Sequence, residues 1–160
     1  MIYYLDSSAL VKRYAAESGS DKVTGLIEGE HKIAISWLAI PETLSAVARR
    51  AKGGSISADD LAAIRSQLNQ DMRRFMIVEV YGAPVDGIET LITRHALRGA
   101  DSIHLSTALW LGKAAKSPVV FVASDNELLN AARAERIKTF NPAEESAKYP
   151  VCINNTNPES

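Results

Sequence analysis

Cysteine is almost absent from this chain of 160 residues, in which Cys152 stands alone. A single thiol forms no disulfide within the chain and builds no cysteine-rich zinc site, which excludes small disulfide-stapled and zinc-ribbon folds. Long apolar runs are missing as well, since no stretch approaches the ~20 apolar residues that a bilayer-spanning helix needs. The first residues also lack the basic segment that opens a signal peptide. We therefore expect a cytoplasmic protein that does not contact a membrane.

An excess of basic charge is missing too. The formal net charge is −1, whereas domains that wrap nucleic acid by bulk electrostatics are usually basic overall. Hydrophobic residues make up 46% of the chain and charged residues 23%, the ordinary proportions of a globular protein with a buried core. We expect one domain over residues 1–142, followed by a polar tail over residues 143–160 that is partly disordered or loosely docked.

Short apolar runs alternate with amphipathic stretches along the chain. The periodicity predicts strands at residues 2–5, 33–35, 75–80, 119–122 and 137–140. It predicts helices at residues 8–17, 21–28, 38–52, 57–74, 84–97, 101–112 and 125–136. Because this alternation shows no hairpin signals, we expect an α/β fold, a three-layer α/β/α sandwich with a central, mostly parallel sheet.

Two aspartates follow apolar strands. Asp6 comes directly after the run IYYL, and Asp125 comes shortly after VVFV. In open parallel sheets, ligands bind at the edge where the carboxyl ends of the strands meet. If both strands are central, as their apolar character indicates, the two carboxylates lie near each other at that edge.

Two further acids occupy unusual helical positions. Glu42 shares a helical stripe with Leu38, Ser45 and Arg49, beside the apolar stripe that is expected to face the core. That apolar stripe consists of Ile40, Leu44, Val47, Ala48 and Ala51. Asp101 follows a glycine-containing turn and opens a helix, where a carboxylate is favoured as a cap and by the helix dipole.

Each acid taken singly has an ordinary structural reading. Asp6, Asp101 and Asp125 could each cap a helix, and Glu42 could be a solvated surface residue. Taken together, converging carboxylates without matching bases repel one another and therefore need a cation. Since no Cys or His stands at metal-ligand spacing, oxygen ligands favour Mg²⁺ or Mn²⁺, an ion that supports phosphodiester hydrolysis.

Four segments resemble, in order, the motifs of a PIN domain, specifically the VapC-type toxins of bacterial toxin–antitoxin pairs. They are LDSSALVKRY, IPETLSAVARR, ADSIHLSTAL and VFVASDNELLNAA, and the resemblance runs over residues 2–142. It implies a PIN-like sandwich and a Mg²⁺- or Mn²⁺-dependent endoribonuclease whose four acids are Asp6, Glu42, Asp101 and Asp125. It also implies a homodimer that is neutralised by a VapB-like antitoxin.

The resemblance assigns roles within this set. Asp6 and Asp101 are expected to bind the metal most directly, and Ser8 is expected to hold Asp6 in place. One departure concerns the last motif, where relatives often carry Ser or Thr two residues before the fourth acid. Here that position is Ala123 and the hydroxyl stands at Ser124. The supporting role of Ser124 and direct metal binding by Asp125 are therefore open.

Basic residues near these motifs are candidates for contact with RNA phosphates. They are Lys12, Arg13, Arg49 and Arg98, for each of which a solvated surface role is an equal alternative. His104 follows Asp101 by about one helical turn and is expected to pack or to support the site. No histidine pair is evident to drive 2′-hydroxyl attack, so cleavage should leave a 5′-phosphate and a 3′-hydroxyl.

Three other functions compete with this reading. An aspartyl phosphatase normally has a second acid two residues after the first, where this chain has Ser8. A receiver-like signalling domain fails for lack of paired acids after the first strand. A catalytically silent PIN-like module that binds RNA or a protein remains the main alternative, and metal binding would discriminate it from an enzyme.

Overall fold

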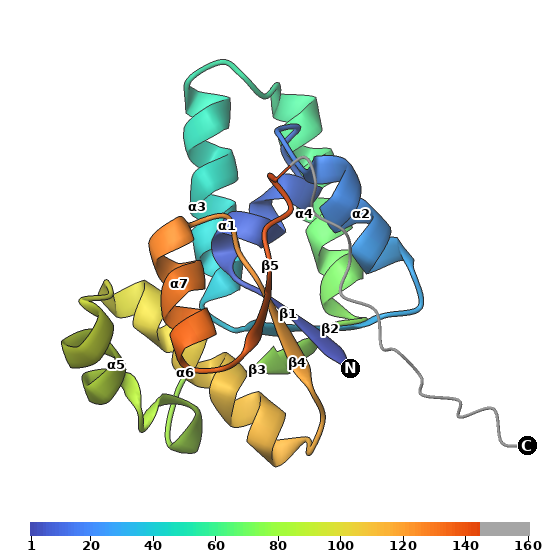
Figure 1. The fold of residues 1–160 in the computed structure, drawn as a ribbon. Helices are drawn as coiled ribbons and strands as arrows, with labels where there is room; N and C mark the ends of the chain where they lie inside the picture. Colours follow the sequence, from blue (N-terminus) through green and yellow to red (C-terminus); the bar gives the residue numbers. More distant parts are fainter. Residues whose placement is uncertain (145–160) are drawn as a thin grey trace, which may run out of the picture.

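The computed structural model describes residues 1–144 and builds them around one parallel sheet (Figure 1). Within this part of the chain the strand order is β3-β2-β1-β4-β5, and every neighbouring pair is parallel. The strands are β1 (Ile2–Leu5), β2 (Lys32–Ser36), β3 (Met76–Val78), β4 (Val119–Val122) and β5 (Lys138–Phe140). All five predicted strands are present, with β3 shorter than its apolar run indicated.

The helices alternate with these strands. They are α1 (Ser7–Leu10), α2 (Ser20–Glu28), α3 (Ala39–Lys52), α4 (Ala58–Met72), α5 (Ile88–His95), α6 (Gly99–Ala114) and α7 (Asn126–Ala134). Two 3₁₀ turns complete the set, η1 (Val11–Arg13) and η2 (Ala83–Val85). Ser57 caps α4 as predicted, because its hydroxyl accepts a hydrogen bond from the backbone N–H of Asp60 at 3.0 Å.

Two predicted helices are wrong in extent. The first, at residues 8–17, is only α1 followed by the turn η1. The Ser20 hydroxyl donates to the carbonyl of Ala15 and accepts from the N–H of Glu17, and such local bonds compete with a continuing helix. The second, at residues 84–97, is divided into η2 and α5, because the chain bends at Gly87 before the helix begins.

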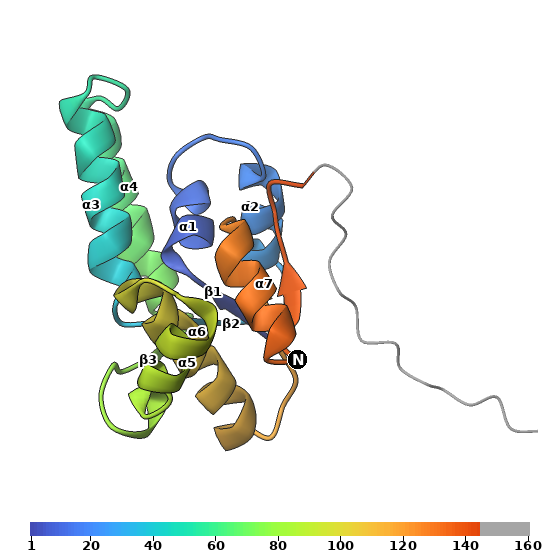
Figure 2. The same cartoon turned by 60° about the vertical axis from the view of Figure 1, so that its left-hand side comes forward.

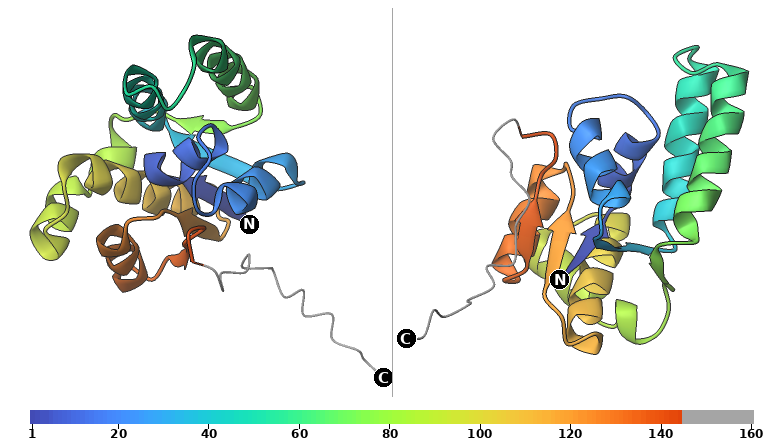
Figure 3. Two further views of the ribbon diagram at one scale, coloured as in Figure 1. Left: turned by 90° about the horizontal axis from the view of Figure 1, so that it is seen from above. Right: turned by 90° about the vertical axis from the view of Figure 1, so that its right-hand side faces the viewer.

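Alternation along the strands separates two apolar cores. Tyr3 and Leu5 of β1 belong to a cluster that includes residues of α1 to α4, whereas Ile2 and Tyr4 belong to a cluster with α5, α6 and α7. Figure 3 shows these helices on opposite sides of the sheet. The fold is therefore the predicted three-layer α/β/α sandwich with a parallel central sheet.

The order of the strands defines a switch point between β1 and β4, at one edge of the sheet. From β1 the chain runs outward through β2 to β3, and it then returns to the other side of β1 as β4 and β5. The carboxyl ends of β1 and β4 therefore form the point where the strand order reverses, which is where open α/β sheets bind ligands. The backbone N–H of Asp6 donates to the carbonyl of Val122 at 3.0 Å and joins these two ends.

The long helices α3 and α4 lie side by side and extend beyond the sheet (Figure 2). No helix within residues 1–144 is both long and apolar enough to cross a bilayer. The predicted polar tail lies outside the described residues from residue 145 onward, and the domain bounds at residue 142 stay a prediction.

Candidate active site

Asp6 is buried at the carboxyl end of β1. Its Oδ1 caps α1 by accepting the N–H of Ala9 at 2.8 Å, and the Ser8 hydroxyl lies 2.8 Å from Oδ1 and 2.9 Å from Oδ2. Burial raises the pKa of Asp6 to about 6, although His104 and these hydrogen bonds oppose the shift. The charge of Asp101 makes a smaller contribution to this raised pKa, so the two acids share one electrostatic environment. The expected contact between Ser8 and Asp6 is present.

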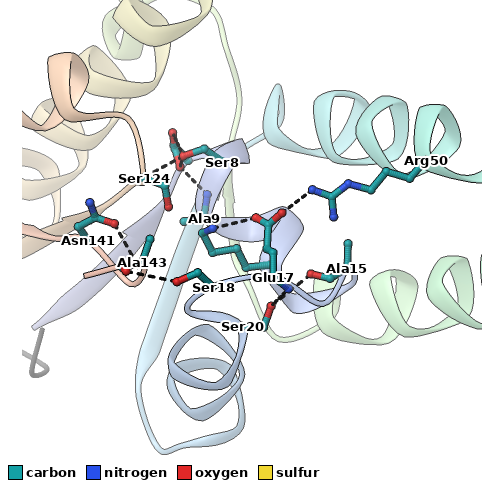
Figure 4. Close-up of polar contacts among 12 residues, drawn as sticks. Ser8, Ala9, Ala15, Glu17, Ser18, Ser20, Arg50, Ser124, Asn141 and Ala143 are labelled. Atoms are coloured by element: carbon teal, nitrogen blue, oxygen red, sulfur yellow. Dashed lines mark hydrogen bonds and ion pairs between the residues drawn. The ribbon is translucent and has the colours of Figure 1, made fainter. Parts of the chain in front are cut away.

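Ser8 also joins the ends of β1 and β4. Its hydroxyl oxygen accepts the backbone N–H of Ser124 at 2.9 Å (Figure 4). The hydroxyl of Ser124 itself is buried and has no hydrogen-bond partner among residues 1–144. An oxygen without a partner in a buried position is unusual, and here it lies beside the Asp6 environment.

Asp101 lies in the first turn of α6, but it does not cap that helix. The capping position is held by Arg98, which makes no side-chain cap bond, so the predicted cap role of Asp101 is wrong. The Asp101 carboxylate makes no hydrogen bond to any part of the chain that the structure describes, whereas the nearby Ser102 hydroxyl bonds to the carbonyl of Gly99. Burial raises the pKa of Asp101, and the charges of Asp125 and Glu42 raise it further.

Asp125 is exposed and caps α7. Its Oδ1 accepts the N–H of Leu128 at 2.9 Å, so the structural reading of this residue is correct. It also acts on the site electrostatically, because its charge raises the pKa of Asp101. The cap and the proximity to Asp101 are compatible, since the cap bond occupies one carboxylate oxygen.

Glu42 lies in the first turn of α3 and contacts a buried histidine. Its Oε2 is 2.8 Å from Nε2 of His104. Burial acts to raise the pKa of Glu42, but the hydrogen bond and charge of His104 outweigh burial and hold this pKa below its ordinary value. Sequence reasoning placed His104 near the site, because it follows Asp101 by one helical turn, but did not identify Glu42 as its partner.

A hollow of about 440 Å³ opens beside these residues. Its lining includes the complete stripe Leu38, Glu42, Ser45 and Arg49, together with Ser7 and Ser8. In the apolar stripe of α3, only Ile40 and Val47 are buried. Leu44 is exposed, so the expectation that Leu44 faces the core is wrong. The hollow therefore connects Glu42 and Ser8 with a cationic side chain of α3.

The four predicted phosphate contacts differ in their surroundings. Lys12 is buried and lies 2.8 Å from Oε1 of Glu17, an acid that Arg50 also pairs with (Figure 4). Arg13 pairs with Glu28 at 2.7 Å and with Asp71 at 3.1 Å. Lys12 and Arg13 therefore have acidic partners within the fold, and their contact with substrate stays a prediction.

Arg49 and Arg98 remain available. Both are exposed, and Arg49 contacts only the Ser45 hydroxyl, at 2.6 Å, among the bonds that the structure records for its side chain. The charge of Arg98 lowers the pKa of Asp101, so this guanidinium lies near the acids.

The donor set consists of oxygens, which suits a hard divalent cation. The acids do not form a ready metal site in this structure. Within residues 1–144, no group of three or more His, Cys, Asp or Glu side chains lies close enough to hold a metal ion. Neighbouring acids nevertheless raise the pKa values of Asp6 and Asp101, and the Ser124 hydroxyl beside them has no partner in the described part of the chain. Donor chemistry and repulsion fit a cation at this edge.

The model of the PIN domain family matches residues 3–134. The chain belongs to the PIN domain family. Ribonuclease VapC49 and ribonuclease VapC45, from two strains of Mycobacterium tuberculosis, are each 32% identical to it over 111 residues, which cover 69% of this chain and 77% of each relative. The resemblance to VapC-type PIN domains is thereby confirmed.

Solved structures agree with this family in fold. FitAcB from Neisseria gonorrhoeae has a TM-score of 0.62 at 17% identity, over 89% of this chain and 98% of that one. VapBC2 from Rickettsia felis, bound to a DNA fragment from its promoter, has a TM-score of 0.60 at 17% identity, over 88% of this chain and 98% of that one. The PIN domain of this protein therefore has the architecture of these structures.

Proposed function

We propose that this PIN domain is a metal-dependent endoribonuclease toxin of the VapC type, which hydrolyses RNA phosphodiester bonds at Asp6, Glu42, Asp101 and Asp125. The observation that carries the proposal is the state of Asp101. Its carboxylate makes no recorded hydrogen bond within residues 1–144, and burial and two neighbouring acids raise its pKa. An acid in such surroundings is stabilised by a cation, and the curated relatives are named ribonucleases.

Asp6 and Asp101 would hold Mg²⁺ or Mn²⁺, which when bound lowers the pKa of a water and offsets negative charge on a phosphate. The Ser8 hydroxyl lies 2.8 Å and 2.9 Å from the two carboxylate oxygens of Asp6. This contact keeps the carboxylate at the end of β1. Glu42 is held by His104, and Asp125 is fixed as the cap of α7. These two carboxylates, one on α3 and one at the start of α7, would orient the attacking water.

The hollow beside Glu42 is the proposed path of the RNA strand. Arg49 lines it and Arg98 lies near Asp101, so both can neutralise phosphates without breaking a structural ion pair. Attack by water on phosphorus leaves a 5′-phosphate and a 3′-hydroxyl, and a 2′,3′-cyclic phosphate at the product ends would contradict this route.

The proposed function also implies two protein partners, an antitoxin and a second copy of this chain. Structures of similar fold bear the names of VapBC and FitAcB assemblies, one of them bound to promoter DNA. We propose that a VapB-like antitoxin neutralises this protein and that the protein itself is a homodimer. Size-exclusion chromatography with light scattering tests the dimer, since a monomer at working concentration would contradict it.

The activity is tested by incubating purified, antitoxin-free protein with a mixed RNA pool in Mg²⁺, Mn²⁺ or EDTA. The expected result is metal-dependent cleavage that is lost in Asp6→Asn and in Asp101→Asn, with product ends mapped by sequencing. Intact RNA in every sample, from protein that is folded and binds RNA, would instead favour the silent binding module.

A further inference from the structure

His104 is buried and contacts side chains from three other elements. Its Nε2 lies 2.8 Å from Oε2 of Glu42 on α3. Its Nδ1 lies 3.2 Å from the hydroxyl of Tyr4 on β1 and 3.3 Å from the hydroxyl of Ser36 on β2. The side chain is 1% exposed, and these three side chains are the recorded partners of its ring nitrogens within residues 1–144.

The partners decide which ring nitrogen carries a proton. A carboxylate only accepts hydrogen bonds, so Nε2 must donate to Glu42. The two hydroxyls at Nδ1 can each donate or accept, and burial raises the pKa of the Tyr4 hydroxyl, which therefore keeps its proton. The arrangement therefore directs an Nε2–H at Glu42 and leaves the two hydroxyls to satisfy Nδ1.

We propose that His104, fixed by the hydroxyls of Tyr4 and Ser36, is a positioning residue that holds the Glu42 carboxylate at the rim of the RNA hollow. The proposal rests on the proposed function, since it assigns a way to prepare one of the four acids. Glu42 is half-buried and has a flexible side chain, and a hydrogen bond from a rigid, buried ring restricts its rotamers.

A purely structural role is the alternative. Tyr4 stacks on Phe121 with ring centroids 5.6 Å apart and meets His104 edge-on at 6.2 Å, so the ring also fills the core. Packing alone, however, places no constraint on which nitrogen faces Glu42. A structural residue would change the free energy of unfolding, whereas a positioning residue changes kcat in proteins that remain folded.

The first experiment needs neither RNA nor metal. In protein labelled with ¹⁵N-histidine, long-range ¹H–¹⁵N spectra report the protonation of each ring nitrogen, and His104→Gln assigns the signals among the three histidines. We expect a protonated Nε2 on His104, with its signal shifted in Glu42→Gln. An Nδ1–H tautomer that leaves Nε2 bare would overturn the proposal, whether or not the protein cleaves RNA.

The second experiment uses a matched pair of variants. His104→Leu removes the donor to Glu42 and should lower kcat by about 10- to 100-fold with little change in KM. His104→Gln keeps an N–H at the end of a side chain of suitable length and should recover most of the loss. Thermal unfolding of both variants separates this effect from unfolding, and equal losses of kcat in the two folded variants would contradict the proposal.

A double-mutant cycle completes the test. On a Glu42→Gln background, His104→Leu should change kcat by no more than about two-fold, because the carboxylate that His104 positions is already gone. Fully independent effects of the two substitutions would show that His104 acts elsewhere. If the wild-type protein cleaves no RNA, the proposed activity fails, and the histidine spectra alone decide the contact with Glu42.

Discussion

Asp71 and Asp6 are buried to the same extent, 2% and 3% exposed, yet they have opposite surroundings. Asp71 on α4 accepts hydrogen bonds from Arg13, Tyr14 and Gln67, each at 3.1 Å, and the first of these donors carries a full positive charge. Asp6 receives bonds from a serine hydroxyl and a backbone N–H, both neutral, and Asp101 adds negative charge nearby.

The difference extends to the regions around them. On the side of α1 to α4, Lys12, Arg13 and Arg50 are each paired with an acid. At the carboxyl ends of β1 and β4, neighbouring acids raise the pKa values of Asp6 and Asp101, and the buried His104 lowers them. Removing one partner of a buried ion pair destabilises a fold strongly, whereas acids that repel one another are stabilised by a bound cation.

Asp6→Asn should produce the largest change in activity. It removes a proposed metal ligand and should lower the rate of RNA cleavage by about 1,000-fold, equivalent to about 4 kcal/mol in the barrier. Stability should stay the same or rise, because Asn keeps an acceptor for Ala9 and no longer repels Asp101. Single-turnover cleavage and thermal unfolding measure the two effects, and a destabilised but fully active variant would break the comparison.

Asp71→Asn should do the reverse. The substitution leaves the Arg13 guanidinium without its buried partner and should lower the free energy of unfolding by about 3 kcal/mol. Cleavage per folded molecule should not change, because Asp71 lies outside the acid cluster. Urea denaturation with activity measured below the transition gives both numbers, and a loss of turnover in the folded variant would contradict this assignment.

Arg49→Ala sharpens the comparison among the basic residues. If Arg49 neutralises one phosphate in the hollow, its loss should raise KM several-fold and reduce the slope of log affinity against log salt by about 1. Lys12→Ala is the matched control, because Lys12 is paired with Glu17 and should affect stability alone. RNA binding over a salt series would contradict the assignment if the two variants gave the same slope.

The smallest effect concerns an ion pair that links α5 to the end of α7. The hydrogen bond from His95 and the ion pair with Arg94 hold the pKa of Glu135 below its ordinary value. The stabilisation that this ion pair gives to the fold is therefore present above the pKa of Glu135 in the unfolded chain, about 4.3. It is lost as the pH falls through the lower pKa of Glu135 in the folded protein. Glu135→Gln should remove a few tenths of a kcal/mol of this acid-dependent stability, measured by unfolding at several pH values.

Local patterns revealed much of the site from the sequence. Asp6 and Asp125 were found because parallel strands end at one edge, and Glu42 was found because it shares a stripe with Arg49 that lines the hollow. The fold followed from alternating strands and helices in the same way. Each strand and helix depends on neighbours within a few residues, which periodicity captures, and the shared edge then follows from a parallel sheet in which β1 and β4 are neighbours.

Side-chain pairs between residues far apart in the chain could not be predicted from the sequence. Arg13 bonds to Asp71, 58 residues away, and His104 bonds to Glu42, 62 residues away, and no spacing rule joins such pairs. The sequence therefore offered Arg13 as a contact for RNA or as a solvated surface residue, and did not reveal its ion pair with Asp71 on α4. Asp101 was expected to be a cap because it opens a helix, but α6 begins two residues earlier at Gly99.

Asp6 and Asp101, at the edge of the sheet, are proposed to bind a divalent cation. A calorimetric titration of Mn²⁺ into the purified protein tests this binding without RNA. Saturable binding is expected for the wild type and for Asp71→Asn, and its loss is expected in Asp6→Asn and Asp101→Asn. Binding that is absent from the wild type, or that persists unchanged in folded Asp6→Asn and Asp101→Asn, would contradict this proposal.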